Sequence, residues 1–298
     1  MPSSSKGTAR AGTLFLVATP IGNLEDITLR ALRTLKEASC IACEDTRHTQ
    51  KLLNHYGISK RLVSYHEHNE LTRAAELVVE LEQGASVALV SDAGMPAISD
   101  PGHHLVSLCR RHHIPVVPIP GASALVAALA ASGISTESFL FLGFPPSRAG
   151  QRRRALGELK SSPHTLVFYE APHRLVETLR DAQEVFGERE AVAAREVTKV
   201  HEEFLSGTLG QLCAAFEKKP PRGEITLLIS GAAGSASHGA AHPDGDGRKV
   251  SLAARVEAIA RESGVDRKTA LKFAARELGL TRREAYKQML LGRSPGPS

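Results

Sequence analysis

The chain has 298 residues, of which 42% are apolar and 23% are charged, a composition that is ordinary for a globular protein and excludes disordered and fibrous classes. The length predicts two domains with a small appendage. No stretch approaches the roughly 18 consecutive apolar residues of a membrane span, and residues 1–12 lack the apolar centre of a signal peptide. We therefore expect a cytoplasmic protein.

The formal net charge of +5 is unevenly distributed. From Arg248 onward, twelve Lys and Arg stand against five Asp and Glu, a net charge of +7, which leaves 25 against 27, or −2, for the rest. A concentrated basic segment is typical of proteins that contact nucleic-acid phosphates, although a solvated face with this composition is commoner.

Short apolar runs alternate with stretches of helical pattern. The expected strands are 14–18, 40–43, 87–90, 116–119, 139–144, 165–169, 191–195 and 225–230. The expected helices are 28–38, 72–83, 103–112, 122–132, 173–186 and 208–218. Several strands are apolar on consecutive positions, as are strands that helices cover on both faces, so the pattern favours an α/β fold with largely parallel sheet.

The four cysteines are expected to stay thiols in a reducing compartment. Cys40 and Cys43 have the C-x-x-C spacing of zinc and redox sites, but no second ligand pair stands at metal-site spacing. We therefore interpret both as core residues of an apolar strand and expect no metal.

The chain divides at changes of composition. A tail at 1–12, expected to be disordered, precedes an N-terminal lobe at 13–132 and a second lobe at 133–231, with a cleft between the lobes. A flexible Gly, Ala and Ser linker at 232–249 follows, and a helical module is expected at 250–293.

Helix-start and helix-stop residues punctuate the helical module. Ser251 and Asp266 are predicted helix caps, Gly264 ends the first helix, and a capping box begins a third. Two helices joined by a tight turn are typical of a helix-turn-helix, whose second helix would contact RNA. Its basic residues are Arg282, Arg283 and Lys287. A small protein-contact module fits the same pattern.

Polar loops follow the strands, at the edge where open α/β sheets bind ligands. Residues 18–28 (ATPIGNLEDIT) lack the spacing of a P-loop, and no GxGxxG occurs in the chain. The motifs usual for nucleotide hydrolysis and dinucleotide binding are therefore missing from the sequence. Residues 44–49 (EDTRHT) either form ion pairs or contact a substrate.

The most specific loop is 91–102 (SDAGMPAISDPG). Asp92 and Asp100 flank small residues, which lets a ligand approach the backbone while a carboxylate meets a cation or hydroxyl. Residues 120–124 (PGASA) then open a helix whose free N–H groups can hold ligand oxygens.

Two loops of the second half, FYEAPHR and REVTK, follow strands in the same way. Their Lys and Arg side chains bring positive charge near the cleft, although such side chains more often form ion pairs with neighbouring glutamates. The residues concerned are Arg174, Arg195 and Lys199, with Glu170 and Glu196 as partners.

Taken in order, TPIGNLEDITLRAL, EDTRHT, SDAGMPAISDPG, VVPIPGASA, FYEAPHR and REVTK resemble the motifs of the tetrapyrrole methylase superfamily, specifically its ribosomal branch. The resemblance runs from about Thr13 to Gly231, and the tail from Val250 resembles the helix-turn-helix at the end of that family's members. It implies a homodimer of two α/β lobes with an interlobe cleft and a small C-terminal helical module.

The same resemblance implies the activity. Such enzymes bind S-adenosylmethionine in the cleft and methylate the ribose 2'-oxygen of a cytidine in the decoding region of 16S rRNA, in the small ribosomal subunit. The cofactor pocket would be formed by Asp92, Met95, Ser123, Ala124 and Tyr169, with Pro20 close by. Met95 stands where related sequences often have Thr.

Transfer to a hydroxyl is helped by a proton acceptor and by cations near the reacting oxygen. We expect Glu44, Asp45 or Glu196 to take the proton, and Arg47, Arg195 or Lys199 to orient phosphate or oxyanion. Two other functions compete: a methyltransferase of the same fold acting on a tetrapyrrole precursor, and a non-catalytic ribosome-binding factor.

Overall fold

A computed structural model describes residues 12–232 and 252–277, together with Ala285 and Met289. The chain forms two compact units, residues 1–239 and 240–298, and each is described by itself. Within the described residues, none of the helices is both long enough and apolar enough to span a membrane.

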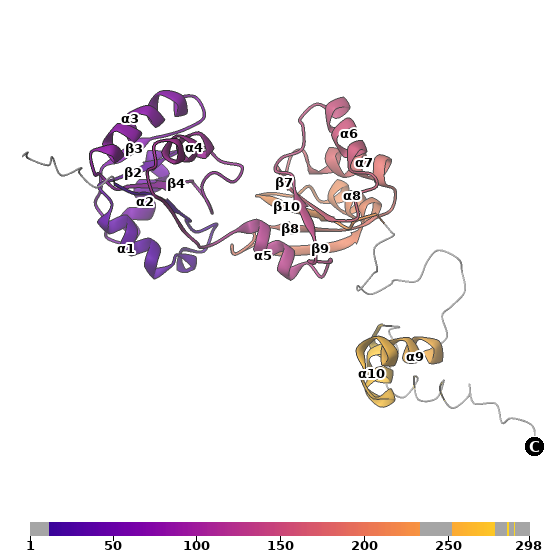
Figure 1. Ribbon diagram of the computed structural model, residues 1–298. Helices are drawn as coiled ribbons and strands as arrows, with labels where there is room; N and C mark the ends of the chain where they lie inside the picture. The colour runs from indigo at the N-terminus through magenta and orange to yellow at the C-terminus, as the bar shows by residue number, and fades with distance from the viewer. Residues whose placement is uncertain (1–11, 233–251, 278–284, 286–288, 290–298) are drawn as a thin grey trace, which may run out of the picture. The chain divides into compact units, whose positions relative to one another are not determined.

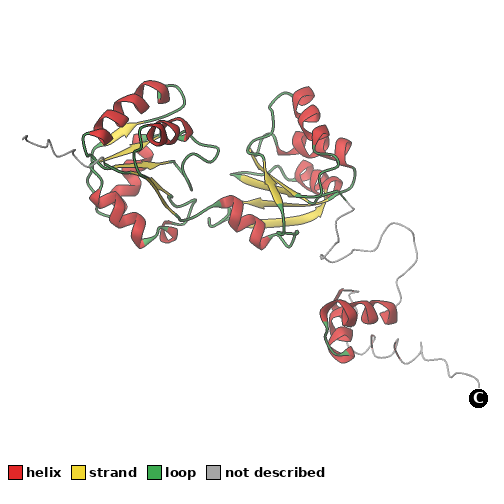
Figure 2. Ribbon diagram, in the orientation of Figure 1, coloured by secondary structure: helices red, strands yellow, loops and turns green. Residues whose placement is uncertain are grey.

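The first lobe is a parallel sheet with helices on both faces (Figures 1 and 2). Its strand order is β3-β2-β4-β1-β5. The strands are β1 (Leu14–Val17), β2 (Cys40–Cys43), β3 (Leu62–Ser64), β4 (Val87–Val90) and β5 (Val116–Ile119). The helices are η1 (Leu24–Asp26), α1 (Leu29–Glu37), α2 (Thr46–His55), α3 (Glu70–Glu82) and α4 (His103–Arg111). Helices α1 and α2 pack on one face and α3 and α4 on the other, which explains the consecutive apolar positions.

Strand β2 places the two cysteines of the C-x-x-C pair in different cores. Cys40 belongs to the core beneath α3 and α4, whereas Cys43 belongs to the core beneath α1 and α2, and both are fully buried. Side chains of a strand alternate between the faces of its sheet, so these two thiols cannot converge on one metal ion.

The second lobe is a mixed sheet of order β6-β7-β10-β8-β9. The strands are β6 (Phe139–Phe141), β7 (Thr165–Glu170), β8 (Glu190–Arg195), β9 (Glu203–Thr208) and β10 (Ile225–Ile229). Only β6 and β7 run parallel, and the other neighbours are antiparallel. The prediction of largely parallel sheet is therefore wrong for this lobe, because helices on both faces make buried strands uniformly apolar whichever way they run.

Helix α5 (Ala124–Ala131) covers one face of the second sheet, and α6 (Ala149–Glu158), α7 (Leu175–Phe186) and α8 (Leu209–Lys218) cover the other. Ala128 and Leu129 of α5 pack against Val167 and Leu228. This helix precedes the lobe boundary proposed after residue 132, yet it packs on the second sheet, so the chain passes between the lobes through the loop that leads into α5.

The C-terminal unit contains two described helices, α9 (Leu252–Ser263) and α10 (Arg267–Glu277), which share an apolar core. Gly264, with φ +63°, ends α9, and Asp266 Oδ1 accepts a hydrogen bond from Thr269 N at 3.1 Å, as expected of a cap. The residues predicted to contact RNA lie outside the described part of the chain: Arg282, Arg283 and Lys287.

Candidate active site

One cavity, of about 720 Å³, is lined by loops of both lobes. The first lobe and the start of the helix that follows β5 contribute residues 21, 92–95, 98–100, 118 and 120–126, and the second lobe contributes residues 144, 169–172, 194, 197 and 224–226. This volume lies within the range of small-molecule sites, and the contributing loops follow β4, β5, β7 and β8, where the sequence placed its polar motifs.

Close contacts hold the loops of the first lobe together. Thr19 and Gly94 exchange backbone hydrogen bonds of 2.9 and 3.1 Å, and Thr19 Oγ1 donates to the carbonyl of Ser91 at 3.1 Å. A β-carbon at Gly121 would stand 2.9 Å from Cβ of Ala18. These positions require small residues because two stretches of backbone meet there.

The loop after β4 also has unusual backbone conformations. Ala97 has φ +68° and Ser99 has φ +60°, a region that non-glycine residues rarely adopt and that concentrates at functional sites. Asp100, the next residue, lines the cavity.

Helix α5 begins at the cavity wall. Ser123 caps it by accepting a hydrogen bond from Val126 N at 3.4 Å, and Leu125 N donates to the hydroxyl of Tyr169 at 3.3 Å. The ring of Tyr169 packs edge-on against Phe141, with ring centroids 4.9 Å apart. The positive end of the α5 dipole therefore faces the cavity, beside an aromatic wall.

The cavity is apolar on its walls and acidic at one part of its lining. Burial first, and then the negative charges of Glu44 and Asp92, raise the pKa of Asp100 to about 6. Burial, together with the charge of Asp92, also raises the pKa of Glu44, which lies outside the lining. The loops after β2 and β4 thus gather carboxylates whose negative charges help to raise the pKa values of Asp100 and Glu44.

Five of the six predicted cofactor-binding residues line the cavity: Asp92, Met95, Ser123, Ala124 and Tyr169. Pro20 does not; it is buried next to Ile21, which does. Asp100, which the sequence motif offered with Asp92 as a carboxylate for a cation or hydroxyl of a ligand, also lines the cavity. Nothing in the sequence indicated Glu224, whose place in the lining depends on the approach of β10.

The predicted catalytic residues of the first lobe lie at the start of α2. Asp45 caps this helix, accepting a hydrogen bond from Arg47 N at 2.8 Å, and pairs with the Arg47 guanidinium at 3.3 Å. The side-chain hydrogen bond from Arg47 holds the pKa of Asp45 below its ordinary value. Asp45 N donates to Oδ1 of Asp92 at 3.3 Å, which ties this turn to the cavity.

The predicted catalytic residues of the second lobe form ion pairs. Lys199 Nζ lies 2.9 Å from Oε1 of Glu196 and 2.9 Å from Oε2 of Glu224. Burial alone would raise the pKa of Glu196, but the hydrogen bonds from Lys199 and from Glu224 N outweigh it and lower that pKa. Arg195 Nε pairs with Glu203 at 3.0 Å. The expected pairing of Lys199 with Glu196 is therefore correct. Among the residues of these ion pairs, only Glu224 lines the cavity.

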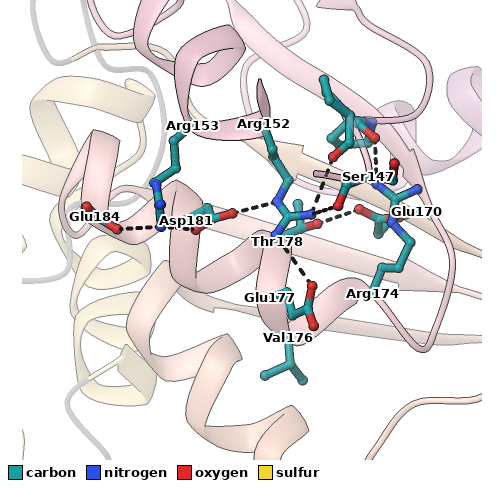
Figure 3. Close-up of polar contacts among 12 residues, drawn as sticks. Ser147, Arg152, Arg153, Glu170, Arg174, Val176, Glu177, Thr178, Asp181 and Glu184 are labelled. Carbon is teal, nitrogen blue, oxygen red and sulfur yellow. Dashed lines mark hydrogen bonds and ion pairs between the residues drawn. The ribbon is translucent and has the colours of Figure 1, made fainter. Parts of the chain in front are cut away.

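A polar network lies behind the cavity wall formed by Glu170 (Figure 3). Glu170 accepts hydrogen bonds from Thr178 Oγ1 at 2.5 Å and from Ala171 N at 2.9 Å, and pairs with Arg174 at 3.5 Å. The Arg174 guanidinium donates to the carbonyl of Pro145 at 2.5 Å. Glu170 therefore serves as an anchor for the loop before α6.

The buried side chain of Arg152 extends this network. Its Nε lies 2.6 Å from Oδ2 of Asp181, and its Nη1 donates to the carbonyl of Ser147 at 3.2 Å (Figure 3). Arg153 pairs with the same aspartate at 3.3 Å. The loop between β6 and α6, which carries Phe144 at the cavity, is thus fixed from both sides.

This fold, with a cavity lined by both lobes, is that of the tetrapyrrole methylases. A family model described as Tetrapyrrole (Corrin/Porphyrin) Methylases matches residues 13–213. Uroporphyrin-III C-methyl transferase from Thermus thermophilus, solved with S-adenyl homocysteine, is 21% identical with a TM-score of 0.54, covering 74% of this chain and 97% of that one. Diphthine synthase is 16% identical with a TM-score of 0.56, covering 74% and 90%.

Relatives of higher identity define the branch. Ribosomal RNA small subunit methyltransferase I of Halalkalibacterium halodurans is 56% identical over 74% of this chain and 76% of its own length. That of Thermotoga maritima is 52% identical over 74% and 99%, and that of Micromonospora olivasterospora is 43% identical over 95% and 88%. The chain belongs to the ribosomal RNA small subunit methyltransferase I family of tetrapyrrole methylases and is a methyltransferase. The family and fold class expected from the sequence are confirmed.

Proposed function

We propose that the chain transfers a methyl group from S-adenosylmethionine to the ribose 2'-oxygen of a cytidine in the decoding region of 16S rRNA. The observation that carries the proposal is a cavity of small-molecule size in a chain 56% identical to a ribosomal RNA small subunit methyltransferase I. Because the proposed substrate is ribosomal RNA, we place the enzyme in the cytoplasm.

The residues of the cavity fit this methyl donor. Small residues such as Gly94 and Gly121 leave room for a ligand to lie against the backbone. Apolar walls suit the adenine, and carboxylates suit hydroxyl and ammonium groups. When bound, the donor supplies an electrophilic methyl group on a cationic sulfur. The residues that would hold it are Asp92, Met95, Ser123, Ala124 and Tyr169, with Pro20 behind the wall.

The acceptor would approach over the carboxylates and cations that the sequence singled out. Glu44 is partly buried beside Asp92 and is the best placed of the predicted proton acceptors, ahead of Asp45 and Glu196. Arg47, 88% exposed, lines an open groove on α2 with Gln50, Lys51 and Asn54, and suits a phosphate. Arg195 and Lys199 would act through their ion pairs, by fixing the loop after β8.

We assign the C-terminal unit to docking on rRNA, because the basic excess of the chain lies there. Its described helix α10 exposes Lys268, Lys272 and Phe273, side chains suited to phosphates and bases. Deleting residues 248–298 should weaken binding to small subunits and flatten its dependence on salt. Unchanged binding would favour the alternative of a protein-contact module.

We also propose a homodimer. Phe139 of edge strand β6 and Leu142, the residue directly after that strand, are exposed, and a second copy could cover their apolar surface. Analytical ultracentrifugation of the purified chain would give the mass of the assembly, and a monomer at micromolar concentration would contradict this part of the proposal.

The competing functions separate in two assays. Calorimetric titration with S-adenosylmethionine should show one saturable site per chain, whereas a non-catalytic ribosome-binding factor would bind none. Labelled donor is then offered with small subunits from cells lacking the enzyme, or with a tetrapyrrole precursor. Label in the rRNA supports the proposal, and label only in the tetrapyrrole overturns it.

A further inference from the structure

We propose that the carboxylate of Asp100 is the group that accepts the proton of the attacking hydroxyl. The inference rests on the proposed function and deepens it by assigning a catalytic residue in the cavity. It departs from the prediction that Glu44, Asp45 or Glu196 takes the proton.

The position of Asp100 is fixed by its loop. It follows Ser99, with φ +60°, and precedes Gly102, with φ +144°, where a β-carbon would stand 2.9 Å from Cδ2 of Leu89 and 3.1 Å from Cβ of Ala97. Asp100 is half-buried and lines the cavity. A carboxylate on a rigid, tightly packed loop keeps the constant geometry that proton transfer needs.

The other titratable groups of the lining have structural partners. Glu170 is held by Thr178 and Arg174, and Glu224 pairs with Lys199 while remaining 75% exposed. The hydroxyl of Tyr169 accepts a hydrogen bond from Leu125 N.

Asp92 accepts a hydrogen bond from Asp45 N. By contrast, the charged residues that act on Asp100 are all acidic: Glu44 from the loop after β2, Asp92 from the loop after β4, and Glu224 from the start of β10. A carboxylate among like charges, with a cavity in front of it, is suited to take up a proton.

The electrostatics agree with this geometry. Burial and the charges of Glu44 and Asp92 raise the pKa of Asp100 to about 6, while a hydrogen bond with Ser91 works in the opposite direction. Just above neutral pH the group is mostly ionised and therefore able to accept a proton. Its pKa still lies closer to the working pH than that of an ordinary aspartate, which favours general-base catalysis.

The reaction balances with Asp100 as the acceptor. The ribose 2'-oxygen forms a bond to the methyl carbon, the carbon–sulfur bond of the donor breaks with its electron pair remaining on sulfur, and the hydroxyl proton passes to a carboxylate oxygen of Asp100. Solvent then receives this proton when the product leaves.

The test compares wild type, Asp100→Asn and Asp100→Glu, with Glu137→Gln as a control at an exposed carboxylate outside the cavity. Three quantities are measured: the single-turnover methylation rate of small-subunit rRNA from pH 5.5 to 9, the donor Kd by calorimetry, and the Asp100 pKa by carbon-13 NMR of the free protein. We expect Asp100→Asn to lower the rate by about 10²- to 10⁴-fold with a donor Kd within about threefold of wild type.

The pH dependence gives a second, independent readout. The wild-type rate should fall below pH 6, this decline should be absent in Asp100→Asn, and Glu44→Gln should lower the Asp100 pKa seen by NMR. A wild-type rate and pH profile in Asp100→Asn, or a loss fully explained by a weaker Kd, overturns the inference alone. Failure of the wild type to methylate any rRNA overturns the proposed function as well.

Discussion

The side chain of Lys199 occupies the space that a β-carbon on Gly22 would need, since such a carbon would stand 2.2 Å from Cγ of the lysine. At the same place, Asn23 N donates to Thr198 Oγ1 at 3.2 Å. These contacts join the loop after β1 to the loop after β8, next to residues of both loops that line the cavity. The approach of the two loops at this point therefore requires a residue without a β-carbon at position 22.

Replacing Gly22 with alanine should force the two loops apart. We expect the donor Kd to rise about tenfold, because displacing the cavity wall misplaces the groups that hold the ligand. Calorimetry measures the effect. The control is Gly157→Ala on helix α6, where a β-carbon would meet no atom within 4 Å. This variant should leave the donor Kd unchanged. Equal Kd values for both variants would contradict the account of this contact.

Alanine at each predicted catalytic position should lower the methylation rate and spare the donor Kd. The set is Glu44, Asp45, Arg47, Arg195, Glu196 and Lys199. If these residues act on the acceptor, losses of about tenfold or more in rate are expected. Arg154→Ala, on the exposed face of α6, is the control. Unchanged rates across the whole set would rule out this assignment.

Breaking the buried pair between Arg152 and Asp181 should destabilise the second lobe strongly. Asp181→Asn removes the nearer carboxylate from the Arg152 cation, which is 1% exposed, and leaves it Glu177 Oε2 at 3.5 Å. Such losses typically cost about 3–5 kcal/mol in the free energy of unfolding. Urea unfolding monitored by circular dichroism measures this quantity. Glu158→Gln, which removes an exposed ion pair, should cost less than about 1 kcal/mol. Comparable costs for the two variants would mean that burial does not govern this network.

Asp100→Asn should stabilise the protein while it impairs catalysis. The folded-state pKa of Asp100 is raised to about 6 from 3.8, so the ionised carboxylate opposes folding above pH 6, and this cost fades as the pH falls from 6 toward 3.8. The variant should therefore have a higher Tm than wild type at pH 7.5, with the difference closing near pH 4. Thermal unfolding at both pH values checks the sign, and a lower Tm at pH 7.5 would contradict it.

Much of the site was predictable because its loops directly follow strands with a clear apolar pattern. The apolar runs before SDAGMPAISDPG and PGASA predicted two strands and the edge of the sheet at which the loops after them meet. Asp92, Met95, Ser123 and Ala124 accordingly line one cavity. Local caps were equally readable, as Asp266 shows.

What the sequence could not give depends on distant segments. Helices α2 and α6 were missed because TRHTQKLLNH and AGQRRRALGE contain few apolar residues, and their sheet supplies the missing stability. The raised pKa of Asp100 requires Glu44, from another loop, to lie near it. The strand directions of the second lobe are also non-local, since buried strands have the same composition in parallel and antiparallel sheets.

The most direct test of the proposed reaction is nucleoside analysis of the product. Purified protein is incubated with labelled S-adenosylmethionine and small subunits from cells that lack the enzyme, and the rRNA is then digested to nucleosides and separated. The proposal predicts label in 2'-O-methylcytidine from the decoding region. Label in a base-methylated nucleoside, or none in rRNA despite tight donor binding, would contradict it.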